Sequence, residues 1–200
     1  MSVAHNIAGD QKANEYIVRL LGDETEYGLK VLYKHVLHDL LLIKIESVPP
    51  CDDEVLKFCS VPLKTKDKVV AIGYEPLNVP SIHDATVMFE PSIMTGVITC
   101  PLFKDKESHK DTNKAACTCA TVQGNSGCPI LLVNGEVVGV LTQLDGTSRE
   151  IITTETMRIF LLEYLQLKDD PKHTIDSLVE TLTARHKPLR KSGRRAGRIR

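Results

Sequence analysis

Short apolar segments that alternate with polar residues or are rich in β-branched residues recur along much of the chain and predict strands. They cover residues 27–35, 40–45, 68–74, 84–91, 94–99, 128–133 and 136–144. Turn-forming residues separate them, and Asn134-Gly135 between two apolar runs is typical of a tight β-hairpin. Many short strands with regular turns favour a β-barrel or a sandwich.

The pattern changes near residue 153, where apolar residues take up helical spacing. Residues 153–167 predict an amphipathic helix that begins near Thr153, and residues 174–186 predict a second, shorter one. Residues 104–116 are polar and have no period, so we interpret them as a surface loop.

Composition is compatible with one globular unit, and charge sets one segment apart. The chain has 200 residues, 42 % of them hydrophobic, and a net charge of −1. Residues 185–200 contain eight Lys or Arg and no acid. We expect residues 187–200 to be a disordered basic tail. It is either a nuclear-import or nucleic-acid-binding segment or a solvated end without a partner. No aromatic residue lies among its charges, so base stacking has no support.

The sequence shows neither a secretory signal nor an apolar run long enough for a membrane span. We therefore expect a cytoplasmic or nuclear protein with reduced thiols and no membrane partner. We expect no metal, because Cys117 and Cys119 lack a second pair of ligands at zinc-site spacing. The oligomeric state is not predicted. The six cysteines are Cys51, Cys59, Cys100, Cys117, Cys119 and Cys128.

Ser126 lies in the segment Gly-Asn-Ser-Gly-Cys-Pro and is a candidate nucleophile if the chain supplies a base and a group that orients the base. Asp39 begins the apolar run 40–45, where a partly buried carboxylate needs a hydrogen-bonding partner. An imidazole N–H is such a partner, and His5 in Val-Ala-His-Asn can provide it.

These three segments, in this order, resemble the signatures of chymotrypsin-fold serine proteases, close to the intracellular trypsin-like and HtrA-type branch. The resemblance runs from His5 to about Leu167. It implies a serine endopeptidase without a cofactor, in which Ser126 attacks the peptide, His5 is the general base and Asp39 orients His5. It also implies that the backbone N–H groups of Gly124 and Ser126 form the oxyanion hole.

The resemblance further implies where a substrate lies. Ala120 would form the floor of the pocket for the side chain before the scissile bond, so a small or apolar side chain is expected there. Thr142, Gln143 and Leu144 would form the pocket wall and pair with an extended peptide or protein substrate.

We therefore expect an all-β, chymotrypsin-like double β-barrel with a C-terminal α-helix. Residues 1–85 would form the N-terminal barrel and residues 86–152 the C-terminal barrel, followed by helices in 153–186. The N-terminal barrel should be incomplete, because the strands that the family places before its histidine are missing from this sequence. Two alternatives stay open: an inactive protease-fold module that binds peptides or proteins, and a nucleic-acid-associated protein that acts through its basic tail.

Overall fold

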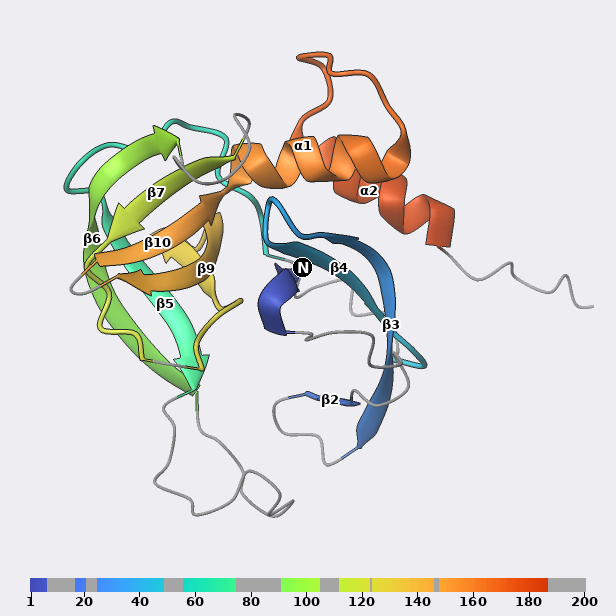
Figure 1. Cartoon of the computed structure of the whole chain (residues 1–200), viewed down its shortest axis with the longest axis horizontal. Helices are drawn as coiled ribbons and strands as arrows, with labels where there is room; N and C mark the ends of the chain where they lie inside the picture. The colour runs from blue at the N-terminus through green and yellow to red at the C-terminus, as the bar shows by residue number, and fades with distance from the viewer. Residues whose placement is uncertain are drawn as a thin grey trace, which may run out of the picture.

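A computed structural model shows two β units with a pair of helices beside them (Figure 1). It describes residues 1–6, 17–20, 25–48, 56–74, 91–104, 112–122, 124–145 and 148–186. The predicted tail 187–200 and most of the strand predicted at 84–91 lie outside these residues. Among the described helices, none is long and apolar enough to cross a membrane.

The first unit is an open four-stranded antiparallel sheet with the strand order β1-β4-β3-β2. Its strands are β1 (Ser2–Val3), β2 (Ile17–Arg19), β3 (Glu26–His35) and β4 (Leu40–Ile45). The short turn between β3 and β4 ends at Asp39. The described sheet does not close on itself, which agrees with the predicted incomplete N-terminal barrel. The predicted boundary at residue 85 is wrong, because residues 68–74 form a strand of the second unit.

The second unit is a closed barrel with the strand order β10-β7-β6-β5-β8-β9. Its strands are β5 (Lys68–Tyr74), β6 (Pro91–Lys104), β7 (Asn113–Cys117), β8 (Pro129–Leu132), β9 (Val137–Asp145) and β10 (Ser148–Thr153). Buried aliphatic residues such as Ile98, Ile130 and Leu141 fill its interior. The predicted hairpin is present between β8 and β9, with Gly135 at φ +87°.

The prediction of a surface loop over 104–116 is wrong at its C-terminal end, where β7 is a strand of the barrel between β10 and β6. Ala115 and Ala116 are buried there, because small side chains fit where the strands of a narrow barrel crowd together. Lys114 is also buried and pairs with Glu150 at 2.9 Å. A polar-looking segment thus enters the sheet because its charge is paired and its other residues are small.

The two helices, α1 (Thr154–Leu165) and α2 (Ile175–His186), pack against the first sheet (Figure 1). Phe160 and Leu161 of α1 and Leu178 of α2 share one buried cluster with Val3 and Leu40 of the sheet. Burial of each such side chain contributes roughly 1.5–3 kcal/mol. The helices therefore supply the core of the N-terminal half, which its own strands do not enclose.

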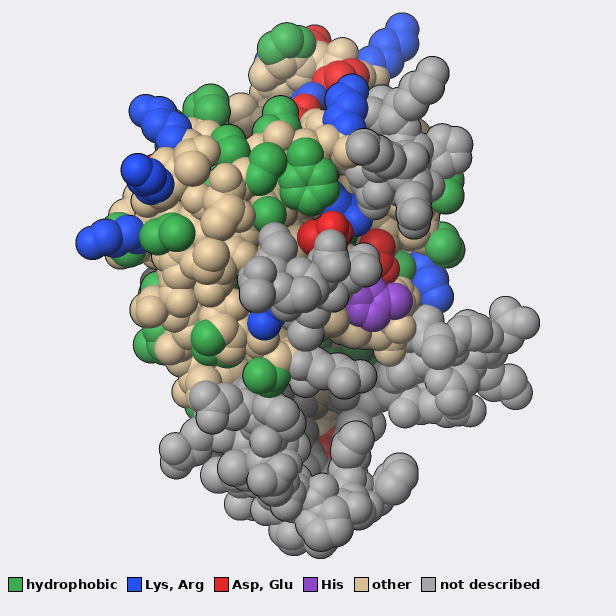
Figure 2. All heavy atoms as spheres, turned by 60° about the vertical axis from the view of Figure 1, so that its left-hand side comes forward, with side chains coloured by type: hydrophobic (Ala, Val, Ile, Leu, Met, Phe, Trp, Pro, Cys, Tyr) green, Lys and Arg blue, Asp and Glu red, His purple; other side chains and the backbone are tan. Residues whose placement is uncertain are grey.

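The hydrophobic side chains seen on the outer face in Figure 2 are scattered among polar ones instead of forming one patch. Lys and Arg side chains project at the left edge of this face and also occur singly within it. Single exposed apolar residues are normal for a protein surface. This face therefore gives no indication of a docking surface.

Candidate active site

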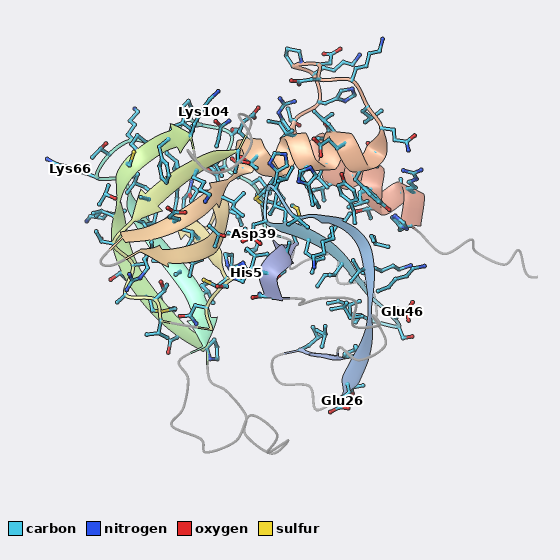
Figure 3. All side chains as sticks on the ribbon, viewed as in Figure 1. His5, Glu26, Asp39, Glu46, Lys66 and Lys104 are labelled. Carbon is cyan, nitrogen blue, oxygen red and sulfur yellow. The ribbon has the colours of Figure 1, made fainter. Side chains whose placement is uncertain are left out.

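His5 and Asp39 lie between the sheet and the barrel and face each other (Figure 3). His5 is in a single 3-10 turn, Ala4–Asn6, that follows β1. Its Nδ1 lies 2.7 Å from Asp39 Oδ2, and its backbone N–H donates to Asp39 Oδ1 at 2.9 Å. The backbone N–H of Ala4 donates to the Asp39 carbonyl at 3.0 Å. One residue of the β3–β4 turn therefore fixes both the backbone and the ring of His5.

The Asp39 carboxylate determines which nitrogen of His5 carries the proton. A carboxylate only accepts hydrogen bonds, so the Nδ1 of a neutral His5 must be the donor. Its Nε2 then holds the lone pair that a general base needs. Asp39 itself has φ +51°, a left-handed conformation that aspartate tolerates better than most residues.

Thr142 of β9 joins Asp39 to the predicted nucleophile. Its hydroxyl donates to Asp39 Oδ2 at 2.6 Å, and its backbone carbonyl accepts from the Ser126 hydroxyl at 3.3 Å. The Thr142 side chain is buried. This residue was predicted to lie in the pocket wall. Its contact with Asp39 could not be predicted, because the pattern of β9 gives no sign of which partner the hydroxyl meets.

Ser126 lies in a tight turn between β7 and β8. The backbone N–H of Gly127 donates to the Leu141 carbonyl at 2.8 Å, and the N–H of Leu141 donates to the Cys128 carbonyl at 3.0 Å. These bonds anchor the turn to β9. Among the described residues the Ser126 hydroxyl bonds to Thr142 and not to His5. The structure thus forms the predicted His5–Asp39 pair directly and connects Ser126 to that pair through Thr142.

The segment before Ser126 leaves two backbone donors available. Asn125 closes a turn with Val122, because its side-chain oxygen accepts from the Val122 N–H at 3.0 Å and its own N–H donates to the Val122 carbonyl at 3.1 Å. Gly124 lies within this turn with φ +100°, a conformation that favours glycine. Neither the Gly124 N–H nor the Ser126 N–H donates to another residue that the structure describes.

Asn6 contacts the nucleophile turn, a role that sequence reasoning missed. Its side-chain amide donates to the Ser126 carbonyl at 2.9 Å and to the Ser2 hydroxyl at 3.4 Å. The only signal in the sequence was its place directly after His5. Asn6 thereby connects the turn that carries the base with the turn that carries the nucleophile.

The remaining predicted substrate residues lie at the same end of the barrel. Ala120 is exposed in the segment after β7. Gln143 and Leu144 belong to β9, and their side chains lie outside what the structure describes. In the barrel, β10 runs between β7 and β9. The predicted floor and wall therefore continue from two strands that flank β10.

Cys128 lies two residues after Ser126, but it does not have the character of a reactive thiolate. Burial raises the pKa of its thiol to about 12. The thiolate, and not the thiol, is the nucleophilic form of cysteine. Around neutral pH the hydroxyl of Ser126 is therefore the better candidate nucleophile in this turn.

A second cluster lies at the other end of the β3–β4 turn. Among the described residues, only His35, His38 and Glu163 bring three possible metal ligands within 4.8 Å of one another. The two imidazole rings are stacked at 4.2 Å with 18° between their planes, and the Nε2 of each faces the Glu163 carboxylate, at 3.5 Å for His35 and 3.9 Å for His38. His35 Nδ1 also accepts from the His38 N–H at 3.1 Å. The cluster therefore links the β3–β4 turn to α1 through contacts between side chains of the protein.

The trypsin-like peptidase domain family matches residues 1–140, and the chain belongs to this family. The active form of the Rv3671c protease from M. tuberculosis is similar in structure, with 19 % identity and a TM-score of 0.60. That match covers 86 % of this chain and 71 % of the protease. The inactive form of the same protease has 20 % identity and a TM-score of 0.63, over 82 % of this chain and 77 % of that one. No curated protein matches the chain.

Membership confirms the expected fold, a chymotrypsin-like protease fold with an incomplete N-terminal half. The predicted class, a trypsin-like peptidase, is confirmed at the level of the family.

Proposed function

We propose that this protein is a serine endopeptidase that cleaves peptide bonds through an acyl-enzyme. The observation that carries the proposal is the His5–Asp39 contact of 2.7 Å, held from a second side by the Thr142 hydroxyl. A histidine whose Nδ1 is fixed by a buried or half-buried carboxylate is a base with one defined tautomer. The Ser126 hydroxyl lies against the same Thr142.

In the proposed reaction, the Ser126 oxygen attacks the carbonyl carbon of the scissile bond while His5 Nε2 takes the serine proton. The negative charge that develops on the carbonyl oxygen is stabilised by the N–H groups of Gly124 and Ser126. One such donor lowers the barrier by roughly 3–4 kcal/mol. His5 then gives the proton to the leaving amine, and a water that His5 deprotonates hydrolyses the acyl-enzyme. No step as written requires a metal or a cofactor.

The substrate is proposed to be an extended peptide that pairs with β9 at Thr142, Gln143 and Leu144. The side chain before the scissile bond would then lie between β9 and the segment that contains Ala120. An exposed strand edge binds an extended peptide through backbone hydrogen bonds and reads alternate side chains in pockets.

The second candidate is an inactive module that binds peptides in the same place. The observation that favours it is the Ser126 hydroxyl, which bonds to the Thr142 carbonyl and to no imidazole among the described residues. Catalytic hydrogen bonds are often long before substrate binds and shorten in the complex, so this observation weighs against activity only in part. A nucleic-acid role for residues 185–200 and a cytoplasmic or nuclear location stay predictions.

The test is covalent labelling of the purified chain with a fluorophosphonate, measured by intact mass. The proposal predicts one adduct, which is lost in Ser126→Ala and in His5→Ala and retained in Ser177→Ala. Ser177 is a matched control because it lies on α2 and its hydroxyl donates to the Thr174 carbonyl at the start of that helix. A folded protein that takes up no label would overturn the endopeptidase and leave the binding module.

A further inference from the structure

The β3–β4 turn has an exposed tip, yet it ends at the residue that must meet His5. Val36 and Leu37 at the tip are 73 % and 47 % exposed. Asp39 has φ +51°, and its backbone N–H donates to the Val36 carbonyl at 3.1 Å. A sparsely populated backbone conformation persists only where its surroundings hold it. Because the exposed tip supplies little packing, another residue of the turn has to anchor it.

His38, directly before Asp39, is the buried residue of this turn. Its Nδ1 lies 2.8 Å from the hydroxyl oxygen of Thr112, which is buried as well. The next residue, Asn113, is bound to α1, because its backbone N–H donates to the Thr156 hydroxyl and its carbonyl accepts from the same hydroxyl, each at 2.8 Å. Buried polar groups are stable only when they are hydrogen-bonded. His38 therefore ties the turn to the beginning of β7, at a point that α1 itself holds.

The other side of His38 lies against Glu163 of α1, where three side chains from β3 and the turn gather. The Nε2 atoms of His35 and His38 face the carboxylate, and the Tyr33 hydroxyl donates to its Oε2 at 3.4 Å. Neutral His35 carries its proton on Nε2, since its Nδ1 accepts from the His38 N–H. That proton faces the carboxylate. The turn is thus held from α1 as well as from the barrel, and Figure 1 shows it next to α1.

We propose that His38 is a positioning residue: by anchoring the turn to Thr112 and Glu163 it keeps the Asp39 carboxylate against His5. This inference rests on the proposed function, because it concerns how the same site is assembled. His38 acts through Asp39, since the two residues are adjacent and a rotation of the backbone at His38 moves the carboxylate. A misplacement of about 1 Å is enough to slow an enzymatic reaction about 100-fold.

A buried histidine can also serve stability alone. In that case its loss would lower the unfolding midpoint and leave the ring of His5 as it is. The two roles differ in one observable, the tautomer of His5, because the contact of its Nδ1 with Asp39 determines which nitrogen carries the proton.

The first experiment compares rates of fluorophosphonate labelling. His38→Leu should lower the rate about ten- to hundredfold and Thr112→Val about tenfold, because each removes a polar anchor of the turn. His38→Asn, whose amide can take the place of Nδ1, and Thr112→Ser should recover most of the rate. In the Asp39→Asn background, His38→Leu should change the rate by less than about twofold, since the residue it acts through is already lost. His173→Leu, in the loop between α1 and α2, is the matched control and should change nothing.

The second experiment needs no catalysis. NMR of the histidine side-chain nitrogens, at a pH at which the imidazole is neutral, reports which nitrogen of His5 carries the proton. The His5 signals are assigned from their loss in His5→Gln. The proton should be on Nδ1 in the original protein and in His173→Leu, and this preference should be lost in His38→Leu as it is in Asp39→Asn.

Loss of the Nδ1–H tautomer in folded His38→Leu supports the inference, even if nothing is labelled and the endopeptidase is wrong. A tautomer that is the same with and without His38, or an original protein without the proton on Nδ1, overturns it. Labelling of Ser126 would then still uphold the endopeptidase. If His38→Leu does not fold, the tautomer of His5 in Thr112→Val decides in the same way.

Discussion

The side-chain amide of Asn6 donates a hydrogen bond of 2.9 Å to the backbone carbonyl of Ser126, a residue 120 positions further along the chain. Asn6 directly follows the proposed base, and Ser126 is the proposed nucleophile. The contact crosses from the N-terminal sheet to the barrel. The spacing between base and nucleophile is therefore set partly by one amide group and not only by the packing of the two units.

We expect Asn6→Ala to lower the rate of fluorophosphonate labelling about tenfold, because loss of one hydrogen bond leaves the two turns less well fixed. Asn6→Asp should be worse, since a carboxylate cannot donate to the Ser126 carbonyl and repels it. Labelling kinetics and thermal melting are measured together. Unchanged labelling by both variants would show that Asn6 has no positioning role.

Thr142→Val should slow labelling about tenfold, because it removes the hydroxyl that holds Asp39 while keeping a similar shape. Thr142→Ser keeps the hydroxyl and should stay within about twofold of the original rate. The backbone carbonyl that accepts from Ser126 is the same in all three proteins. A serine variant as slow as the valine variant would assign the effect to packing.

Gly127→Ala should destabilise the protein and abolish labelling. Gly127 has φ +90°, and a Cβ there would lie 2.6 Å from the Ser2 hydroxyl. The left-handed conformation alone costs roughly 1–2 kcal/mol for a residue with a Cβ. Gly135→Ala is the matched control, since Gly135 has φ +87° but nothing within 4 Å. Urea unfolding should show a larger loss for Gly127→Ala, and Ser2→Gly should restore part of it.

Cys128 should resist iodoacetamide at pH 8 in the folded protein and react after unfolding, because burial raises the pKa of its thiol to about 12. An unfolded thiol loses its proton near a pKa of about 8.5. Between these values the folded state binds more protons than the unfolded state, so stability falls as pH rises. Cys128→Ala should make the unfolding midpoint less sensitive to pH in this range. Rapid alkylation of Cys128 at pH 8, mapped by peptide mass spectrometry, would contradict the raised pKa.

Much of the fold could be predicted from local patterns, because the strands β3, β4, β5, β8 and β9 carry β-branched and apolar residues at strand spacing. The strand β7 could not be predicted, since Lys114 and two alanines look like a loop until the partner Glu150 is known. The three motifs identify His5, Asp39 and Ser126 as the candidate catalytic residues. The roles of Thr142 and Asn6 depend on contacts between residues far apart in the chain, which a local pattern does not contain.

The packing of α1 and α2 on the first sheet has a consequence for the order of events during synthesis. Val3 and Leu40 share their core with Phe160 and Leu178, so the earliest strands remain without their covering until the second helix has left the ribosome. Domains form as units while the chain emerges at about 5–20 residues per second. The barrel, complete by residue 153, can close first. The half that holds His5 and Asp39 must wait for both helices, so the base is fixed in place only after the barrel that carries Ser126.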